Sequence, residues 1–365
     1  MPSAPRAYRL LLTTWQDFGA GSIQSVQYLA QGLLARGHDL RVACPADGVL
    51  GVRLRENGVP VVPFDFAKGW SLRTARKLAE VIREHDIELV DAQESRDRKA
   101  AVLARLVLRT RNRLVITRRQ MTASFPLQNA LYSAAADRII AISQGVADDL
   151  ARHGMSARKI SVVHTGLDPA RVAGAVSEAE VQTLRDEMGL DPALPTVGVV
   201  ARRKDQETLL RAVGELARPL NILFVGIEKD ASLAALEPAL PTGTRVAYTG
   251  FRERVLPFYS LLDVMVLTTI REGLSQAILE SMALGVPVIS AAVGGTPEVV
   301  SPEVNGLLYP PSDHHALADH LRRLLDDPAL QATFVQGGRA TVSGPFHADS
   351  LAAGTEAVYR ELIGP

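Results

Sequence analysis

Two glutamates, Glu272 and Glu280, have the most informative spacing in the chain. Gly273 separates a predicted strand from a predicted helix that begins near Leu274, so we expect Glu272 in a loop and Glu280 two turns inside the helix. A glycosidase needs two carboxyl groups ~5–9.5 Å apart, whereas this spacing covers roughly 9–12 Å along a helix axis. Hydrolysis by this pair is therefore not expected.

The same helix suits ligand binding. Glu280 could accept hydrogen bonds from two vicinal hydroxyls of a ribose, and N–H groups at the helix start could bind anionic or hydroxyl oxygens. The alternative is that Glu272 only complements the helix dipole and that Glu280 is a surface residue. Apolar neighbours favour a largely buried setting for Glu280. The N–H groups at the helix start that could bind these oxygens belong to Leu274, Ser275 and Gln276.

Three consecutive cations, Arg202–Lys204, follow a predicted strand over 196–201. A helix expected from about Asp205 would place its positive N-terminus beside these side chains at the edge of the sheet, an arrangement that suits a diphosphate. The alternative is a solvated basic turn that pairs with Asp205 or Glu207.

A glycine pair, Gly19 and Gly21, follows the first predicted strand and opens a helix. Glycines at this place let backbone N–H groups approach a phosphate. A dehydrogenase fingerprint is incomplete, because Gln24 stands where its third glycine belongs and Cys44 stands where an acidic residue would end the second strand. A tight strand-to-helix turn without a ligand explains the pair equally well.

No residue pattern indicates a metal site or a disulfide. The sequence has no Asp-x-Asp pair and no cluster of His and Cys, and Cys44 is the single cysteine. His314 and His315 are adjacent, so we expect their rings to point apart on a solvated helix face. The chemistry is therefore predicted to need no metal and no cofactor.

Composition narrows the class of protein. The 365 residues are 47% hydrophobic, and 40 basic residues balance 40 acidic ones to a formal charge of zero, so a nucleic-acid partner is not expected. The apolar stretch Leu10–Leu12 is too short for a signal peptide, and no run approaches the ~18 apolar residues of a membrane helix. A cytoplasmic protein is predicted.

Short aliphatic runs alternate with helical periodicity along the whole chain, which predicts an α/β fold with parallel sheets. We expect two doubly wound Rossmann-like domains that face each other across a cleft. Their expected extents are 1–168 for the N-terminal domain, 169–195 for a connecting segment, 196–345 for the C-terminal domain, and 346–365 for a helix that crosses back to the first domain.

The sequence resembles the retaining nucleotide-sugar glycosyltransferases of the GT-B fold, known as glycosyl transferases group 1 or family 4. In the second half, the resemblance rests on Glu272 and Glu280 with seven residues between them, followed by Met282–Val288 and Gly294–Glu298. In the first half, Ile140–Ser143 and His164–Asp168 are similar to strand ends of that family. The resemblance covers nearly the whole chain.

The resemblance implies a role for each matching residue. Arg202 and Lys204 would bind the donor diphosphate, although Arg203 could replace Arg202 because the three cations are contiguous. Glu280 would bind the ribose, and Glu272 would hold the transferred sugar together with the backbone of Gly273, Leu274, Ser275 and Gln276. The backbone of Gly250 and Phe251 would meet the base, and Gly19 and Gly21 would approach the phosphates.

The implied activity is transfer of a sugar from a nucleoside-diphosphate donor to an acceptor hydroxyl, with retention at the anomeric carbon. A UDP-sugar is favoured over a GDP-sugar, and synthesis of lipopolysaccharide, polysaccharide or glycolipid is the expected setting. Two alternatives stay open. A GT-B sugar-nucleotide epimerase would use the same donor site, and a non-catalytic protein would only bind the nucleotide sugar.

A locally basic segment, residues 96–119, points to the acceptor side. We expect Arg96, Arg118 and Arg119 to contribute to the acceptor site, and the acceptor to be lipid-linked or phosphorylated. Such a surface would also let the protein bind peripherally to the anionic inner face of the membrane. The alternative is a buried helix with solvated arginines at its ends.

Overall fold

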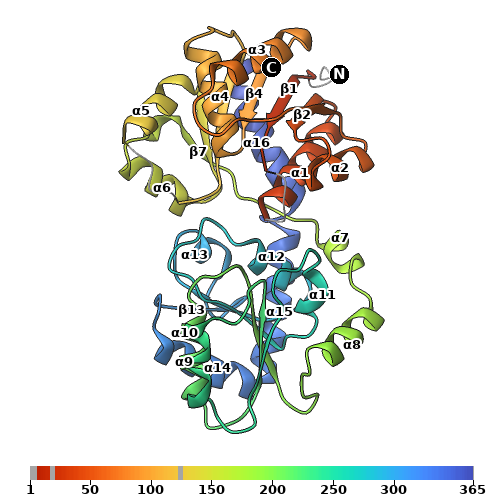
Figure 1. Cartoon of the computed structure of the whole chain (residues 1–365), viewed down its shortest axis with the longest axis vertical. Helices are drawn as coiled ribbons and strands as arrows, with labels where there is room; N and C mark the ends of the chain where they lie inside the picture. The colour runs from red at the N-terminus through yellow and green to blue at the C-terminus, as the bar shows by residue number, and fades with distance from the viewer. Residues whose placement is uncertain (1–5, 17–20, 122–125, 365) are drawn as a thin grey trace. The chain divides into compact units, whose positions relative to one another are not determined.

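The computed structural model describes residues 6–16, 21–121 and 126–364 (Figure 1). The chain divides into two compact units. Unit 1 combines Met1–Gly166 with Ala348–Pro365, and unit 2 is Leu167–His347. Among the described residues, no helix is long and apolar enough to cross a membrane.

Unit 1 contains a seven-stranded parallel sheet in the order β3-β2-β1-β4-β5-β6-β7. The interior strand β1 is buried, and Leu10–Leu12 form a continuous apolar run because helices cover both faces of such a sheet. The strands are β1 (Arg9–Thr13), β2 (Asp39–Cys44), β3 (Val61–Pro63), β4 (Leu89–Ala92), β5 (Arg113–Arg118), β6 (Arg138–Ala141) and β7 (Ile160–Val162).

The C-terminal helix completes unit 1, as expected. Helix α16 lies along α1 (Figure 1), and the two helices approach closely at Gly32, where an added Cβ would come within 2.5 Å of the Ala352 side chain. Unit 1 thus depends on both ends of the chain. Its helices are α1 (Gly21–Ala35), α2 (Val49–Glu56), α3 (Leu72–Glu84), α4 (Ser95–Leu106), α5 (Pro126–Ala135), α6 (Gln144–Arg152) and α16 (Ala348–Ile363).

Unit 2 contains a six-stranded parallel sheet in the order β10-β9-β8-β11-β12-β13. The edge strand β13 was not predicted from the sequence, because its three residues are too few to show a period. The strands are β8 (Thr196–Val200), β9 (Asn221–Val225), β10 (Arg245–Tyr248), β11 (Val264–Leu267), β12 (Val288–Ala291) and β13 (Leu307–Tyr309).

The helices of unit 2 include two that lie in the segment expected to connect the domains. Helix α7 packs against α12 and α15, and α8 packs against α11, so both belong to unit 2. The helices are α7 (Pro169–Gly174), α8 (Glu178–Glu187), α9 (Gln206–Gly214), α10 (Ala231–Ala234), α11 (Leu256–Tyr259), α12 (Gln276–Ala283), α13 (Thr296–Val299), α14 (His314–Asp326) and α15 (Pro328–Ser343).

Both sheets reverse their strand order at one point. In unit 1 the reversal lies between β1 and β4, and in unit 2 it lies between β8 and β11. Open α/β sheets bind ligands outside the carboxyl ends of the strands at such a point. The loops that follow these four strands are therefore the first places to look for a functional site.

Candidate functional site

An ion pair joins the two loops at the reversal point of unit 2. Lys204 lies in the loop after β8 and Glu272 in the loop after β11, and the Nζ atom of Lys204 bonds to Oε2 of Glu272. Both side chains are partly buried. Because β8 and β11 are neighbours in a parallel sheet, residues 68 positions apart in the sequence meet at one edge.

The loop that carries the three cations is held by the side chain of Gln206, a residue that the sequence analysis did not single out. Oε1 of Gln206 accepts a hydrogen bond of 2.7 Å from the N–H of Lys204, and its Nε2 donates one of 2.9 Å to the carbonyl of Arg202. Gln206 is fully buried at the start of α9. It therefore fixes the backbone from which Arg202 and Lys204 extend.

Two acidic side chains, Glu207 and Asp230, hold Arg203. Its guanidinium bonds to both carboxylate oxygens of Glu207, to Asp230 at 2.7 Å and to Ser232 at 2.8 Å. Hydrogen bonds from Arg203 lower the pKa of Glu207 to about 2 and hold that of Asp230 well below its usual range. Arg202 is exposed, and Lys204 faces Glu272.

Glu280 is buried, as the apolar neighbours indicated, and is only 6% exposed. Its Oε2 accepts a hydrogen bond of 2.8 Å from the hydroxyl of Tyr259, a fully buried residue at the end of α11 that the sequence analysis did not single out. Burial and the neighbouring carboxylate raise the pKa of Tyr259 well above its usual range. The tyrosine therefore keeps its proton and donates a hydrogen bond to Glu280.

Helix α12 starts later than predicted. It begins at Gln276 with Ser275 as its N-cap residue, so Leu274 lies in the loop and not at the helix start. The extended backbone of Ser275 delays the first helical turn. Gly273, Leu274 and Ser275 are buried, and this segment leads directly from Glu272 to the helix that carries Glu280.

The predicted base-binding segment follows β10. Gly250 has a φ of 64°, a conformation that favours glycine, and Phe251 is 69% exposed. Nearby, Gly226 has a φ of 99°, and a Cβ there would come within 2.9 Å of the Ala201 carbonyl. Glycine at position 226 thus lets the end of β9 approach the loop that carries the cations.

The site residues expected in unit 1 differ in their contacts and in their burial. Gly19 lies outside the described residues, and Gly21 is the first residue of α1. The guanidinium of Arg96 stacks over the ring of Trp15, 3.8 Å from its centre. Arg118 and Arg119 are buried at the end of β5.

A polar network at the reversal point of unit 1 includes Arg119, which donates a hydrogen bond to Oε1 of Gln93, and Nε2 of Gln93 donates one of 3.4 Å to Thr117. Asp91 accepts hydrogen bonds from Thr117 at 2.8 Å and from Tyr359 of α16 at 2.6 Å. Burial raises the pKa of Asp97 to about 8 and lowers that of Arg118 to about 9. The hydrogen bond between Tyr359 and Asp91 therefore ties the C-terminal helix to the sheet, while burial disfavours the charged forms of Asp97 and Arg118.

Only part of the basic segment 96–119 faces solvent. Arg105 and Arg113 both pair with Asp137. Arg109 and Arg111 are exposed after α4, next to two exposed apolar side chains, Leu106 at 43% and Val107 at 55%. The exposed part is therefore both basic and apolar.

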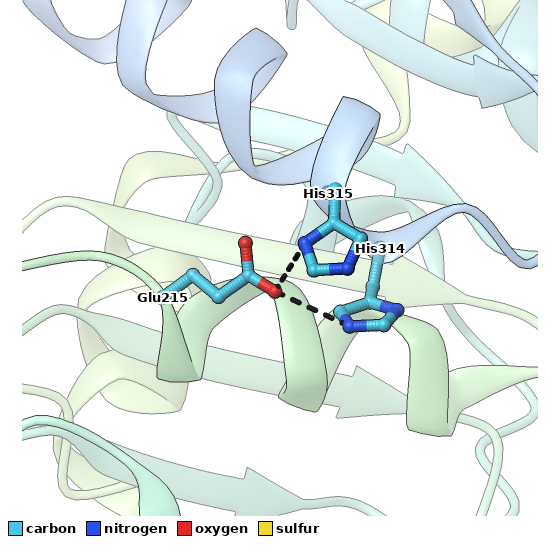
Figure 2. Close-up of side chains that lie close together, drawn as sticks. All are labelled: Glu215, His314 and His315. Atoms are coloured by element: carbon cyan, nitrogen blue, oxygen red, sulfur yellow. Dashed lines mark ion pairs between the residues drawn. The ribbon is translucent and has the colours of Figure 1, made fainter.

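The ring orientation expected for the histidine pair is wrong, although His315 is exposed at the start of α14 as expected. The rings of His314 and His315 do not point apart, because both face Glu215 at the end of α9 (Figure 2). Nε2 of His314 lies 3.2 Å and Nδ1 of His315 2.8 Å from Oε1 of Glu215. The helical rule for adjacent residues fails here because both residues lie in the first turn of α14, where their side chains can reach the end of α9.

Both units are similar to known glycosyltransferases. The pattern described as Glycosyltransferase Family 4 matches residues 20–171, and that described as Glycosyl transferases group 1 matches residues 191–327. A D-inositol 3-phosphate glycosyltransferase of Streptomyces avermitilis is 33% identical over 247 residues, which cover 62% of this chain and 52% of that protein. The chain spans a little over half the length of the curated relatives it matches.

Solved structures agree on the fold. A glycosyltransferase of Rickettsia africae matches 99% of this chain and 100% of its own with a TM-score of 0.86 at 18% identity. Anabaena Alr3699/HepE, solved with UDP-glucose, matches 97% of this chain and 98% of its own with a TM-score of 0.80 at 21% identity. The predicted pair of Rossmann-like domains is confirmed.

Proposed function

Because this chain belongs to the GT-B glycosyltransferases of group 1 and family 4, we propose that it transfers a sugar from a nucleoside-diphosphate donor to an acceptor hydroxyl. The observation that carries the proposal is the meeting of Lys204 and Glu272 at the carboxyl ends of β8 and β11. A UDP-sugar is the proposed donor, supported by the similar fold of Anabaena Alr3699/HepE, which was solved with UDP-glucose.

In this proposal, Arg202 and Lys204 bind the donor diphosphate. Arg203 is the weaker candidate, since Glu207 and Asp230 already neutralise it. A diphosphate that approaches Lys204 would replace Glu272 as the partner of its ammonium group, which frees the carboxylate of Glu272 for hydroxyls of the transferred sugar.

The remaining donor contacts follow from the same loops. Glu280 binds the ribose through the carboxylate that Tyr259 orients. The backbone of Gly273, Leu274, Ser275 and Gln276 contacts the sugar, and that of Gly250 and Phe251 contacts the base.

The proposed reaction proceeds with retention. The acceptor oxygen bonds to the anomeric carbon on the face that the diphosphate leaves, and the electron pair of the broken C–O bond stays with the diphosphate. A departing phosphate oxygen takes the acceptor proton, so no protein base is needed. Arg202 and Lys204 stabilise the charge that develops, a role worth about 10²–10³ in rate per well-placed group, and no metal is required.

We further propose a lipid-linked or phosphorylated acceptor, in the synthesis of a cell-envelope polysaccharide or glycolipid, at the cytoplasmic face of the membrane. The related Streptomyces avermitilis enzyme is named for a phosphorylated acceptor, inositol 3-phosphate. Arg96, Arg118 and Arg119 are the proposed acceptor-side residues. The exposed surface of Leu106, Val107, Arg109 and Arg111 combines apolar and basic side chains as a peripheral membrane contact does.

Incubation with a panel of UDP-sugars and GDP-sugars, followed by NMR, tests the proposal. Slow release of the nucleoside diphosphate, with a sugar product that keeps the donor's anomeric configuration, is the expected result. A new sugar nucleotide would instead identify an epimerase, and binding without turnover would identify a non-catalytic sensor. An inverted product would refute the retaining mechanism.

A further inference from the structure

We propose that Glu215, His314 and His315 form a binding site for one divalent transition-metal ion, of which Zn²⁺ is the representative (Figure 2). The site would join the end of α9 to the start of α14. It is independent of the proposed transfer reaction.

The positions of the three side chains fit metal coordination. One ligand atom from each residue can be chosen so that all lie within 4.8 Å of one another. Zn–N and Zn–O distances of about 2.0–2.2 Å place tetrahedral ligands about 3.3–3.6 Å apart. The ring nitrogens of His314 and His315 already lie 3.2 and 2.8 Å from one oxygen of Glu215, so small side-chain rotations would admit an ion.

The backbone that carries these side chains is held in place. Asp313 caps α14 by accepting a hydrogen bond of 3.0 Å from the N–H of Ala316. Just before it, the hydroxyl of Ser312 donates a hydrogen bond of 2.8 Å to Asp205 at the start of α9. Helix α14 also packs on α9, and its Leu317 is fully buried. The start of α14 is therefore held in place, packed on α9, before any ion binds.

The ligand types select the metal. Two imidazoles and one carboxylate suit Zn²⁺ and its neighbours in the transition series, whereas Mg²⁺ prefers oxygen ligands. The partly exposed rings leave room for a water molecule in the fourth position.

The electrostatic setting and the position separate this site from the donor loops. Glu215 stands at the C-terminus of α9, where the helix dipole favours a cation, and the carboxylate of Asp313 offsets the opposite end of the dipole of α14. Asp205 lies next to the cation loop, and the ten residue steps from Asp205 to Glu215 correspond to about 15 Å along the axis of α9.

Calorimetric titration of the untagged, chelator-treated and desalted protein tests the proposal. One Zn²⁺ should bind per chain, with a rise in the melting temperature, while MgCl₂ at the same concentration should produce neither effect. Absence of a Zn²⁺ binding isotherm in the wild-type protein would overturn the proposal.

Variants locate the ion. His314→Gln, His315→Gln and Glu215→Gln should each weaken Zn²⁺ binding by more than about tenfold, because each removes a direct ligand. The control His85→Gln, which changes a histidine at the end of α3 in unit 1, should bind Zn²⁺ as the wild type does. Unchanged Zn²⁺ affinity in a folded His314→Gln, His315→Gln double variant would place the ion elsewhere and refute the site. Donor turnover is a separate readout, and we expect it to be the same in the double variant and the wild type.

Discussion

The hydroxyl of Tyr259 donates a hydrogen bond of 2.8 Å to Oε2 of Glu280, and both side chains are buried. Tyr259 ends α11, and Glu280 lies in the middle of α12. The hydroxyl of Tyr259 satisfies one oxygen of the Glu280 carboxylate with a hydrogen bond and so fixes the orientation of the carboxylate. The carboxylate proposed to bind the ribose is therefore oriented before the donor arrives.

Tyr259→Phe should lower the free energy of unfolding by about 1–3 kcal/mol, because the ring still packs while a buried carboxylate loses a donor. Urea denaturation measures this loss. Tyr309→Phe is a matched control, since Tyr309 is also buried but donates only a long bond of 3.4 Å to the carbonyl of Leu267. Equal free energies of unfolding for the two variants would show that the hydrogen bond to Glu280 makes no specific contribution to stability.

Arg202→Ala and Lys204→Ala should each reduce kcat for donor turnover by about 10²–10³, because both cations are proposed to stabilise leaving-group charge. Arg203→Ala should cause a much smaller loss, since Glu207 and Asp230 hold that side chain. Steady-state kinetics on folded variants provides the measurement. Near-wild-type kcat in the first two variants would contradict the diphosphate assignment.

The buried Asp97 predicts a pH dependence of stability. Burial raises its pKa in the folded protein from 3.8 to about 8, so between these pH values the folded state holds more protons than the unfolded state. Stability should therefore fall as the pH rises through this window. Asp91 and Glu94, whose pKa values are also raised by burial, contribute with the same sign.

Asp97→Asn isolates this contribution. Urea unfolding at a series of pH values should give a flatter profile for the variant than for the wild type. Arg118, with a pKa lowered to about 9, titrates above most of this window. Parallel profiles for the two proteins would show that Asp97 does not hold its proton in the folded state.

The exposed surface of Leu106, Val107, Arg109 and Arg111 predicts binding to anionic vesicles. Replacing both arginines with Gln should cost up to about 2 kcal/mol of binding free energy, at ~1 kcal/mol per cation near an anionic surface. Co-sedimentation of the protein with anionic vesicles at low and high salt measures this loss of binding. The control replaces two exposed arginines of α3, Arg73 and Arg76, with Gln, and equal losses in both double variants would indicate a non-specific charge effect.

The sequence predicted most of the fold, whereas the roles given to the residues of the candidate site stay predictions. Aliphatic runs identified the buried parallel strands, and the residues that follow β8 and β11 had to meet because strand ends converge at one edge. Gln206 and Tyr259 were missed because their roles depend on hydrogen bonds made in the folded structure, which no local spacing reveals. The convergence of the histidine pair on Glu215 likewise depends on how α14 packs on α9.

The central claim is that unit 2 binds a nucleoside diphosphate through Lys204 and Glu280. Calorimetric titration with UDP tests it without knowledge of the acceptor. UDP should bind the wild type, and Lys204→Ala and Glu280→Ala should each weaken its affinity by about ten- to a hundredfold, the equivalent of ~1.5–3 kcal/mol for a hydrogen bond to a charged group. Equal UDP affinity in all three proteins, or no binding of either UDP or GDP to the wild type, would contradict the account.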